Sequence, residues 1–255
     1  MHFKLTDEQK LIQKTARDFA INELAPGVVE RDEKKIWPKE EISKMAELGF
    51  MGMMTASKYN GGGMDTISYA LAMEEISRVD ASAAVVMSVN NSLVCYLIEK
   101  FGSDYVKEKY LTQLAMGKKI GAFSLSEPQS GSDASNMRTI ARKKGDYYYL
   151  TGTKNWVTSG INSEFVIVFA LTEQGVGHKG VSCFLVEKGL EGFETGKPEN
   201  KLGIRASDTC ELYFDNVKVS AENLIGSEGE GFIIALATLD GGRIGIASQA
   251  LGIAQ

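Results

Sequence analysis

Three stretches of the sequence carry side chains that could hold a ligand, and the first is "FSLSEPQSGSDA", from Phe123 to Ala134. It offers four serine hydroxyls and contains no lysine, arginine or histidine. Hydroxyls together with successive backbone N–H groups can satisfy the polar edge of a heteroaromatic ring or a phosphate. The Glu-Pro and Ser-Gly pairs are equally typical of a plain turn. From composition alone, a binding loop and a structured turn are therefore equally good interpretations.

The second stretch, "NWVTSG", places one of the two tryptophans, Trp156, two residues before Thr158. An indole face can cover a planar ring while a threonine hydroxyl bonds the edge of that ring. A tryptophan packed in the core is the plainer interpretation. For this stretch taken alone, the core interpretation is preferred.

The third stretch, "DGGR" from Asp240 to Arg243, puts two glycines inside an apolar helix. Each glycine costs a helix about 1 kcal/mol relative to alanine, so we expect close packing or a ligand to require them. Arg243 is the only positive charge in this helix, and we expect an acidic partner or a polar ligand for it. A further glycine-rich stretch, "GSEGEGF", lacks both the Gly-Lys-Ser/Thr of a phosphate loop and a βαβ setting, and it is interpreted as a strand-to-helix turn.

Composition narrows the chemistry further. A net charge of −5 argues against a general nucleic-acid binder. With only two histidines, a histidine metal site is disfavoured, and acid–base work falls to a carboxylate or a cofactor. The three cysteines fit neither a disulfide framework nor zinc-ligand spacing, so we predict no metal site and a cytoplasmic location. We find no signal peptide and no apolar run long enough for a bilayer, and we predict no membrane partner.

The elements that must position these stretches change character twice along the chain. From Thr6 to about Met116 the pattern is helical, with a capping box at Thr6 and Gln9 and a second helix opened by Pro38. From about 121 to 226 short β-branched and aromatic runs alternate with Gly, Asn and Asp, which is typical of a small barrel or sandwich. After about Glu230 an almost wholly apolar helix follows, and it needs cover on all sides.

Four blocks occur in order along the chain: "AFSLSEPQSGSDAS", "YYLTGTKNWVTSG", "KLGIRASDTCELYFDNVKVSAENLIGSEGEGF" and "LDGGRIGIASQALGIAQ". Together they resemble the acyl-CoA dehydrogenase family, and most of all its short-chain (butyryl-CoA) branch. The resemblance covers essentially all 255 residues. It implies an α+β multidomain fold with a helical N-terminal domain (1–120), a middle antiparallel β-barrel domain (121–228) and the first helix of an incomplete C-terminal helical domain (229–255).

The resemblance also implies an FAD cofactor between barrel and bundle. The flavin-binding residues carried over by motif are Phe123, Leu125, Ser126, Gly131, Ser132, Trp156, Val157 and Thr158. Leu125 and Ser126 would donate to the pyrimidine edge of the flavin. The segment 156–158 would pack on the flavin and reach its N5 side. Ser132 would also lie near the pyrophosphate arm of CoA, and Asp240, Gly241, Gly242 and Arg243 would lie at the acyl-CoA pocket.

The implied reaction is FAD-dependent α,β-dehydrogenation of a short-chain acyl-CoA to a trans-2-enoyl-CoA in fatty-acid β-oxidation. Electrons would pass to an electron-transfer flavoprotein, and the full-length family forms homotetramers. The family's base is a glutamate, which burial suits to proton abstraction. In the short-chain branch it lies beyond Gln255, and Gly242 occupies the place of the base in other branches. We therefore predict no catalytic residue within this chain, and we expect these 255 residues alone to be inactive and to bind FAD weakly.

Three alternatives stay open. One is a glutaryl-CoA or branched-chain acyl-CoA dehydrogenase, because pocket residues decide acyl length and branching. Another is a non-catalytic subunit that binds flavin or acyl-CoA. The third, a purely structural helical and β protein, predicts a colourless preparation.

Overall fold

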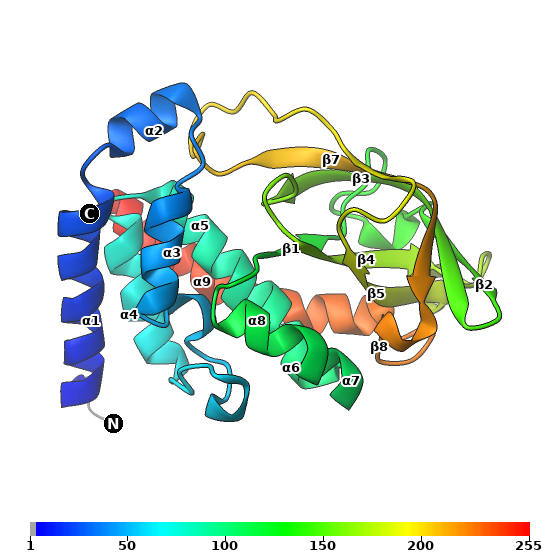
Figure 1. The fold of residues 1–255 in the computed structure, drawn as a ribbon, viewed down its shortest axis with the longest axis horizontal. Helices are drawn as coiled ribbons and strands as arrows, with labels where there is room; N and C mark the ends of the chain where they lie inside the picture. The colour runs from blue at the N-terminus through cyan, green and yellow to red at the C-terminus, as the bar shows by residue number, and fades with distance from the viewer. Residues whose placement is uncertain (1–3) are drawn as a thin grey trace.

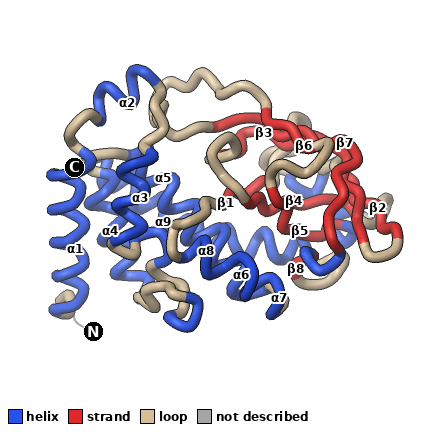
Figure 2. The backbone as a smooth tube through the Cα atoms, in the orientation of Figure 1, coloured by secondary structure: helices blue, strands red, loops and turns tan. Residues whose placement is uncertain are grey.

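A computed structural model describes residues 4–255. Helices gather at one end of the molecule and strands at the other, and a long C-terminal helix extends from the strands into the helices (Figures 1 and 2). The helices are α1 (Asp7–Phe19), α2 (Val28–Lys34), α3 (Lys39–Glu47), α4 (Thr66–Ser77), α5 (Ala81–Ser88), α6 (Tyr96–Phe101), α7 (Asp104–Val106), α8 (Thr112–Ala115) and α9 (Gly231–Ala254). The π-helical segments η1 (Ala20–Leu24), η4 (Val89–Cys95) and η5 (Lys107–Leu111) continue α1, α5 and α7.

The strands are β1 (Gly121–Ser124), β2 (Ile140–Lys144), β3 (Tyr147–Thr158), β4 (Phe165–Leu171), β5 (Val181–Glu187), β6 (Phe193–Thr195), β7 (Thr209–Ser220) and β8 (Leu224–Ile225). They form one sheet in the order β6-β7-β3-β2-β4-β5-β8, with β1 beside β4. The helical N-terminal part and the sheet that follows it are as predicted.

The prediction of a closed antiparallel barrel is wrong. The sheet is open, because its end strands β6 and β8 do not pair with each other. These strands are three and two residues long, which offers too few backbone hydrogen bonds to close a sheet. Two pairings are also parallel: β1 with β4, and β2 with β4 through the single pair Ile140 and Leu171.

The first helix begins as its sequence predicts. The Thr6 hydroxyl accepts from the backbone N–H of Gln9 at 3.1 Å, and the Gln9 side chain accepts from the Thr6 N–H at 3.0 Å. This reciprocal pair satisfies two N–H groups that the helix leaves free. Asp80 likewise caps α5, where its side chain accepts from the backbone N–H groups of Ser82 and Ala83.

Replacing Thr6 with alanine is expected to lower the free energy of unfolding by about 1 kcal/mol, because the Gln9 N–H loses its cap. Urea denaturation followed by circular dichroism measures this change. Thr66→Ala, in the first turn of α4, is the control, because Asp65 and not Thr66 caps that helix. An equal loss in the two variants would contradict the capping role.

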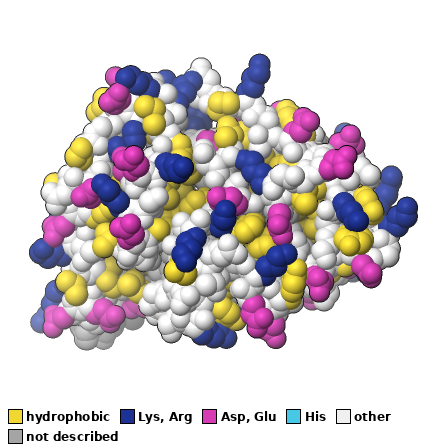
Figure 3. All heavy atoms as spheres, in the orientation of Figure 1, with side chains coloured by type: hydrophobic (Ala, Val, Ile, Leu, Met, Phe, Trp, Pro, Cys, Tyr) yellow, Lys and Arg dark blue, Asp and Glu magenta, His cyan; other side chains and the backbone are white. Residues whose placement is uncertain are grey.

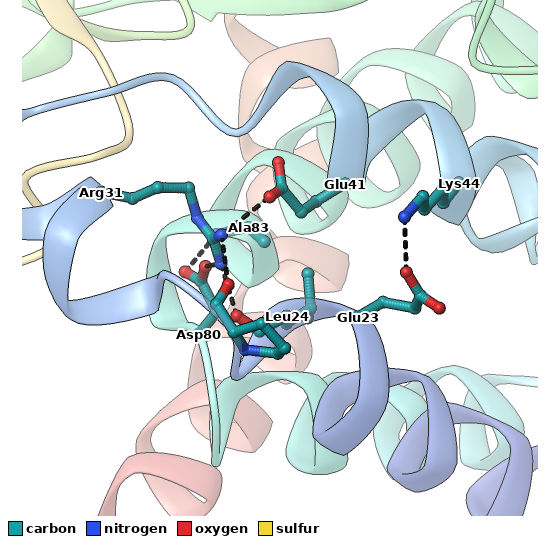
Figure 4. Close-up of polar contacts among 8 residues, drawn as sticks. Glu23, Leu24, Arg31, Glu41, Lys44, Asp80 and Ala83 are labelled. Atoms are coloured by element: carbon teal, nitrogen blue, oxygen red, sulfur yellow. Dashed lines mark hydrogen bonds and ion pairs between the residues drawn. The ribbon is translucent and has the colours of Figure 1, made fainter.

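The short helix α2 has no counterpart among the predicted elements. Gly27 begins it in the left-handed conformation, with φ of 77°. Its buried Arg31 is held by four groups: the Glu41 carboxylate at 2.7 Å, the Asp80 carboxylate at 3.0 Å and the backbone oxygens of Leu24 and Pro26 (Figure 4). Arg31 thus ties α2 to the N-termini of α3 and α5.

The C-terminal helix α9 is continuous through Gly241 and Gly242. It packs against α4, α5, η4 and β5. A Cβ atom at Gly252 would lie 2.2 Å from the backbone oxygen of Glu74, so only glycine allows this approach to α4. The other face of α9 leaves large apolar side chains exposed: Ile233, Leu236, Ile244, Ile246, Leu251 and Ile253.

By length and composition alone, two helical stretches, Ala81–Phe101 and Gly231–Ala254, could cross a membrane. The expectation that no apolar run is long enough is therefore wrong. The first stretch is a core helix, since 78% of its apolar window is buried, whereas only 39% of the second is buried. On the face shown in Figure 3, basic and acidic side chains alternate without a broad patch of one sign.

Candidate functional site

The loop that follows β1 lies directly beside β3. The backbone N–H of Asn155 donates to the backbone oxygen of Ser126 at 2.8 Å. The Lys154 ammonium donates to the backbone oxygen of Leu125 at 3.2 Å. Two stretches separated by about thirty residues of sequence therefore meet at one edge of β3, as the predicted ligand site requires.

This edge presents hydrogen-bonding groups without partners. Within residues 4–255, the backbone N–H groups of Leu125 and Ser126 donate to no other group. The Ser124 hydroxyl is buried and also has no partner in that part of the chain. Donors without partners are expected at a binding site, because buried polar groups are normally paired. Phe123 contributes an apolar wall, with its ring 5.2 Å from that of Phe169.

Trp156 stands out from this edge of β3. A bulge between Lys154 and Val157 turns its backbone to a φ of 58°, a conformation that is unusual for a bulky residue. Its indole is 61% exposed, whereas the neighbouring Val157 points into the core. The interpretation of Trp156 as a core residue is wrong. Thr158, half-buried, ends the strand. Strain of this kind clusters at ligand sites.

Asp208 holds the turn that follows Thr158. Its Oδ2 accepts from the backbone N–H groups of Ile161 at 3.1 Å and Asn162 at 2.9 Å. Burial raises the pKa of this carboxyl, and the hydrogen bonds to Asn162 and Ile161 oppose the rise. Asp208 belongs to the "RASDT" stretch and was not among the predicted site residues.

The loop from Phe123 to Ala134, called the serine loop below, is more exposed to solvent at its far end. Glu127 and Ser130 exchange two backbone hydrogen bonds, of 2.9 and 3.0 Å, which confirms the turn that the Glu-Pro and Ser-Gly pairs indicate. Gly131 and Ser132 follow this turn and are exposed. They lie farther along the loop from the free N–H groups of Leu125 and Ser126. This position is compatible with a ligand that extends past the loop.

A buried ion pair joins the loop to β3. Lys154 Nζ lies 2.8 Å from Glu127 Oε1, and both side chains are almost completely buried. Burial lowers the pKa of Lys154 to about 8, against the opposing effect of Glu127. Burial would raise the pKa of Glu127, but Lys154 and the N–H groups of Arg138 and Thr139 outweigh that effect and lower it.

Sequence reasoning missed both members of this pair. A usable signal was the alternation along β3, where Tyr148, Leu150 and Lys154 occupy inward positions with period two. A lysine at an inward position of a strand needs a buried acid. The loop without positive charge therefore receives its positive charge from the neighbouring strand.

The predicted substrate residues lie at a second place, along α9. A cavity of about 500 Å³ opens between α9 and η4. It is lined by Ser88, Val89, Leu93, Leu239, Gly242, Arg243, Ile246, Ala247 and Ala250. Gly242 and Arg243 line this cavity, whereas Gly241 and Asp240 do not, and their role in acyl-CoA binding stays a prediction. The Asp240 carboxylate instead accepts from Arg243, which confirms the expected acidic partner.

The π-helical segment η4 lies between the loop that follows β1 and the cavity along α9. A Cβ atom at Gly121 of β1 would meet the Val94 side chain at 2.5 Å, and one at Gly242 of α9 would meet Leu93 at 2.7 Å. π-Helical turns are frequent at functional sites. Leu93 and its neighbours in η4 were not among the predicted site residues. Their signal was the polar run "NNS" inside an apolar helix.

The donor set fits the cofactor that the motifs imply. A flavin needs donors for the polar edge of its pyrimidine ring and an apolar surface for its ring face. Unpartnered N–H groups at Leu125 and Ser126, beside an exposed indole at Trp156, supply both. The residues present are therefore compatible with FAD.

The family models of the acyl-CoA dehydrogenase N-terminal domain and middle domain match residues 6–118 and 122–217. A short-chain specific acyl-CoA dehydrogenase of Clostridium acetobutylicum is 47% identical over 255 residues, covering 100% of this chain and 67% of that protein. Butyryl-CoA dehydrogenase from Megasphaera elsdenii has the same fold, with a TM-score of 0.97 and 48% identity over 100% of this chain and 67% of that one.

A chain in a solved structure of the electron transferring flavoprotein of Acidaminococcus fermentans is equally similar. Its TM-score is 0.98 and its identity 48%, again over 100% of this chain and 67% of that one. The chain thus spans about two thirds of the length of these relatives. On the two domain matches and an identity near one half, the chain belongs to the acyl-CoA dehydrogenase family.

Proposed function

We propose that this chain serves the FAD-dependent α,β-dehydrogenation of short-chain acyl-CoA to trans-2-enoyl-CoA, with electrons passed to an electron-transfer flavoprotein. The observation that carries the proposal is the meeting of the serine loop and Trp156 at one edge of β3. The 47–48% identity to short-chain and butyryl-CoA enzymes supports the short-chain substrate class. Its similarity to a chain from an electron transferring flavoprotein structure supports the electron acceptor.

In this proposal the groups of the chain bind and orient. The N–H groups of Leu125 and Ser126 would donate to the pyrimidine edge of FAD, and Trp156 would pack on the ring. Thr158 would reach the N5 side of the flavin, and Gly131 and Ser132 would border the path toward the CoA pyrophosphate. When bound, FAD supplies the acceptor for the β-hydride. The cavity between η4 and α9 excludes water from the acyl chain, because its walls are mostly apolar.

An experiment on FAD uptake tests the proposal. The purified chain is mixed with excess FAD, separated from free cofactor and examined for flavin absorbance. We expect part of the weakly bound FAD to be retained, and its spectrum to shift when butyryl-CoA binds, without turnover. A colourless protein that takes up no FAD would contradict the proposal and favour a purely structural role. Retained FAD without any response to butyryl-CoA would indicate a flavin-binding subunit instead.

The cavity can be tested on its own. Ala247 lines it and is exposed, so Ala247→Phe should place a ring in the cavity without disturbing the core. We expect the dissociation constant for butyryl-CoA to rise at least about tenfold, which corresponds to about 1.4 kcal/mol. Ala254→Phe makes the same change on an exposed part of α9 outside the cavity, and it should leave affinity unchanged. Isothermal titration calorimetry distinguishes the two results, and equal affinities would place the acyl chain elsewhere.

We further propose a homo-oligomer, supported by the apolar face of α9 that the described residues leave uncovered. Sedimentation equilibrium measures the state directly. A strictly monomeric chain at micromolar concentration would contradict this proposal.

A further inference from the structure

Lys154 contacts the serine loop at two groups, the carboxylate of Glu127 and the backbone carbonyl of Leu125. Its side chain is completely buried, and its Nζ lies 2.8 Å from Glu127 Oε1 and 3.2 Å from the backbone oxygen of Leu125. Its partner across the strands, Leu212 on β7, is apolar. Glu127 is therefore the charged group that faces Lys154.

The contacted peptide group has two ends with different surroundings. The Leu125 carbonyl and the Ser126 N–H belong to one trans peptide and point to opposite sides of the chain. The carbonyl end accepts from an ammonium group, whereas the N–H end is without a partner in residues 4–255. Hydrogen-bonded groups in series polarise one another. The ammonium at the oxygen therefore makes the Ser126 N–H a stronger donor.

We propose that Lys154, acting through the Leu125–Ser126 peptide, makes the site bind reduced FAD more tightly than oxidised FAD and so raises the reduction potential of the flavin. This inference rests on the proposed function, because it takes the Ser126 N–H as a donor to the pyrimidine edge. Reduced FAD carries more negative charge on that edge than oxidised FAD. A donor that is strengthened and fixed in place favours the more negative form.

Glu127 keeps the lysine charged without cancelling its effect at the peptide. The ammonium touches the Leu125 oxygen, whereas the carboxylate also accepts from the backbone N–H groups of Arg138 at 2.6 Å and Thr139 at 3.1 Å. The negative charge of the pair is thus partly held by a different segment. Lys154 is a positioning and polarising residue and not a catalytic one, since it acts through the peptide.

The test variant is Glu127→Gln/Lys154→Met. Removing Lys154 alone would leave a buried carboxylate unpaired, which destabilises the fold strongly and would obscure the measurement. The double variant buries no charge, and the amide of the introduced glutamine keeps an oxygen for the N–H groups of Arg138 or Thr139. Glu228→Gln/Lys143→Met is the matched control, because it neutralises an exposed pair of the same two residue types, 3.4 Å apart.

The dissociation constants of oxidised FAD and of dithionite-reduced FAD are measured anaerobically by calorimetry for each full chain. We expect the affinity for reduced FAD relative to oxidised FAD to fall about tenfold in the test variant. This change equals a lowering of the flavin reduction potential by about 30 mV for a two-electron couple. Oxidised FAD should bind within about threefold of the parent, and the control ratio should not move. Equal weakening of both forms would show a purely structural pair and overturn the inference.

A pH series on the parent protein gives a second readout that needs no variant to fold. In the parent, the affinity for reduced FAD relative to oxidised FAD should fall between pH 7 and pH 9, because Lys154 loses its proton near its lowered pKa of about 8. The test variant should lack this step. A parent without the step would also overturn the inference. Failure of the parent to bind FAD in any form would instead refute the proposed function.

Discussion

Replacing Trp156 with alanine is expected to weaken FAD binding by roughly 30-fold, or about 2 kcal/mol, the middle of the range for an aromatic side chain stacked on a heterocycle. The indole is 61% exposed, so its removal leaves no hole in the core and should not lower the stability of the fold. The effect should therefore fall on affinity. Quenching of flavin fluorescence during titration of the protein measures it.

Tyr213→Ala is the matched control for Trp156. Tyr213 is an exposed aromatic residue of β7, in the same sheet, and it lies outside the predicted flavin residues. Its loss should leave FAD affinity unchanged. If both variants bind FAD like the parent, the strained backbone at Trp156 has another cause and the flavin lies elsewhere.

Much of the helical architecture could be predicted because its signals are local. The side chains of Thr6 and Asp80 mark the starts of α1 and α5, because each accepts from backbone N–H groups within three residues. Such caps act wherever the helix packs, so they can be read without knowledge of the fold. The short helix α2 was missed, because it starts at a left-handed glycine and its Arg31 is held by groups of α3 and α5.

Closure of the sheet could not be predicted, because it depends on the ends of the sheet. The repeated short strands and turns are equally typical of a barrel and of an open sheet. The difference lies in the end strands β6 and β8, which each pair with one neighbour and not with each other, and in α9, which packs against β5. None of these facts is local in the sequence.

The cytoplasmic location and the acyl chain length stay predictions.

The candidate site was found through its motifs, but its electrostatics were not. The serine loop and the Trp156 stretch were singled out as ligand-binding and lie side by side. Glu127 was assigned to turn chemistry only, and Lys154 to no role. Their meeting depends on pairing between segments 27 residues apart. Pairing over such a distance is a tertiary fact that composition does not encode.

Replacing Glu127 with leucine is expected to lower the free energy of unfolding by about 3–5 kcal/mol at pH 7, because Lys154 stays buried without its partner. Burial already lowers the pKa of Lys154 from 10.5 to about 8. Between these two pH values the folded protein binds fewer protons than the unfolded chain. The contribution of this lysine to stability therefore rises with pH across that window.

The Glu127→Leu change removes the group that raises the pKa of Lys154, and the pKa of this lysine therefore falls further. The pH range over which its contribution to stability rises then extends below pH 8. The loss of stability relative to the parent should therefore be larger at pH 7 than at pH 9, where the parent lysine is also largely neutral. Urea denaturation at the two pH values measures both losses.

Glu222→Leu, at an exposed position, is the control, and it should lower the free energy of unfolding by less than about 0.5 kcal/mol at either pH. Glu127→Leu/Lys154→Met should recover most of the stability, because an apolar pair replaces the lone charge. A loss that stays constant with pH would show that the carboxylate acts on the backbone N–H groups of Arg138 and Thr139 and not on Lys154.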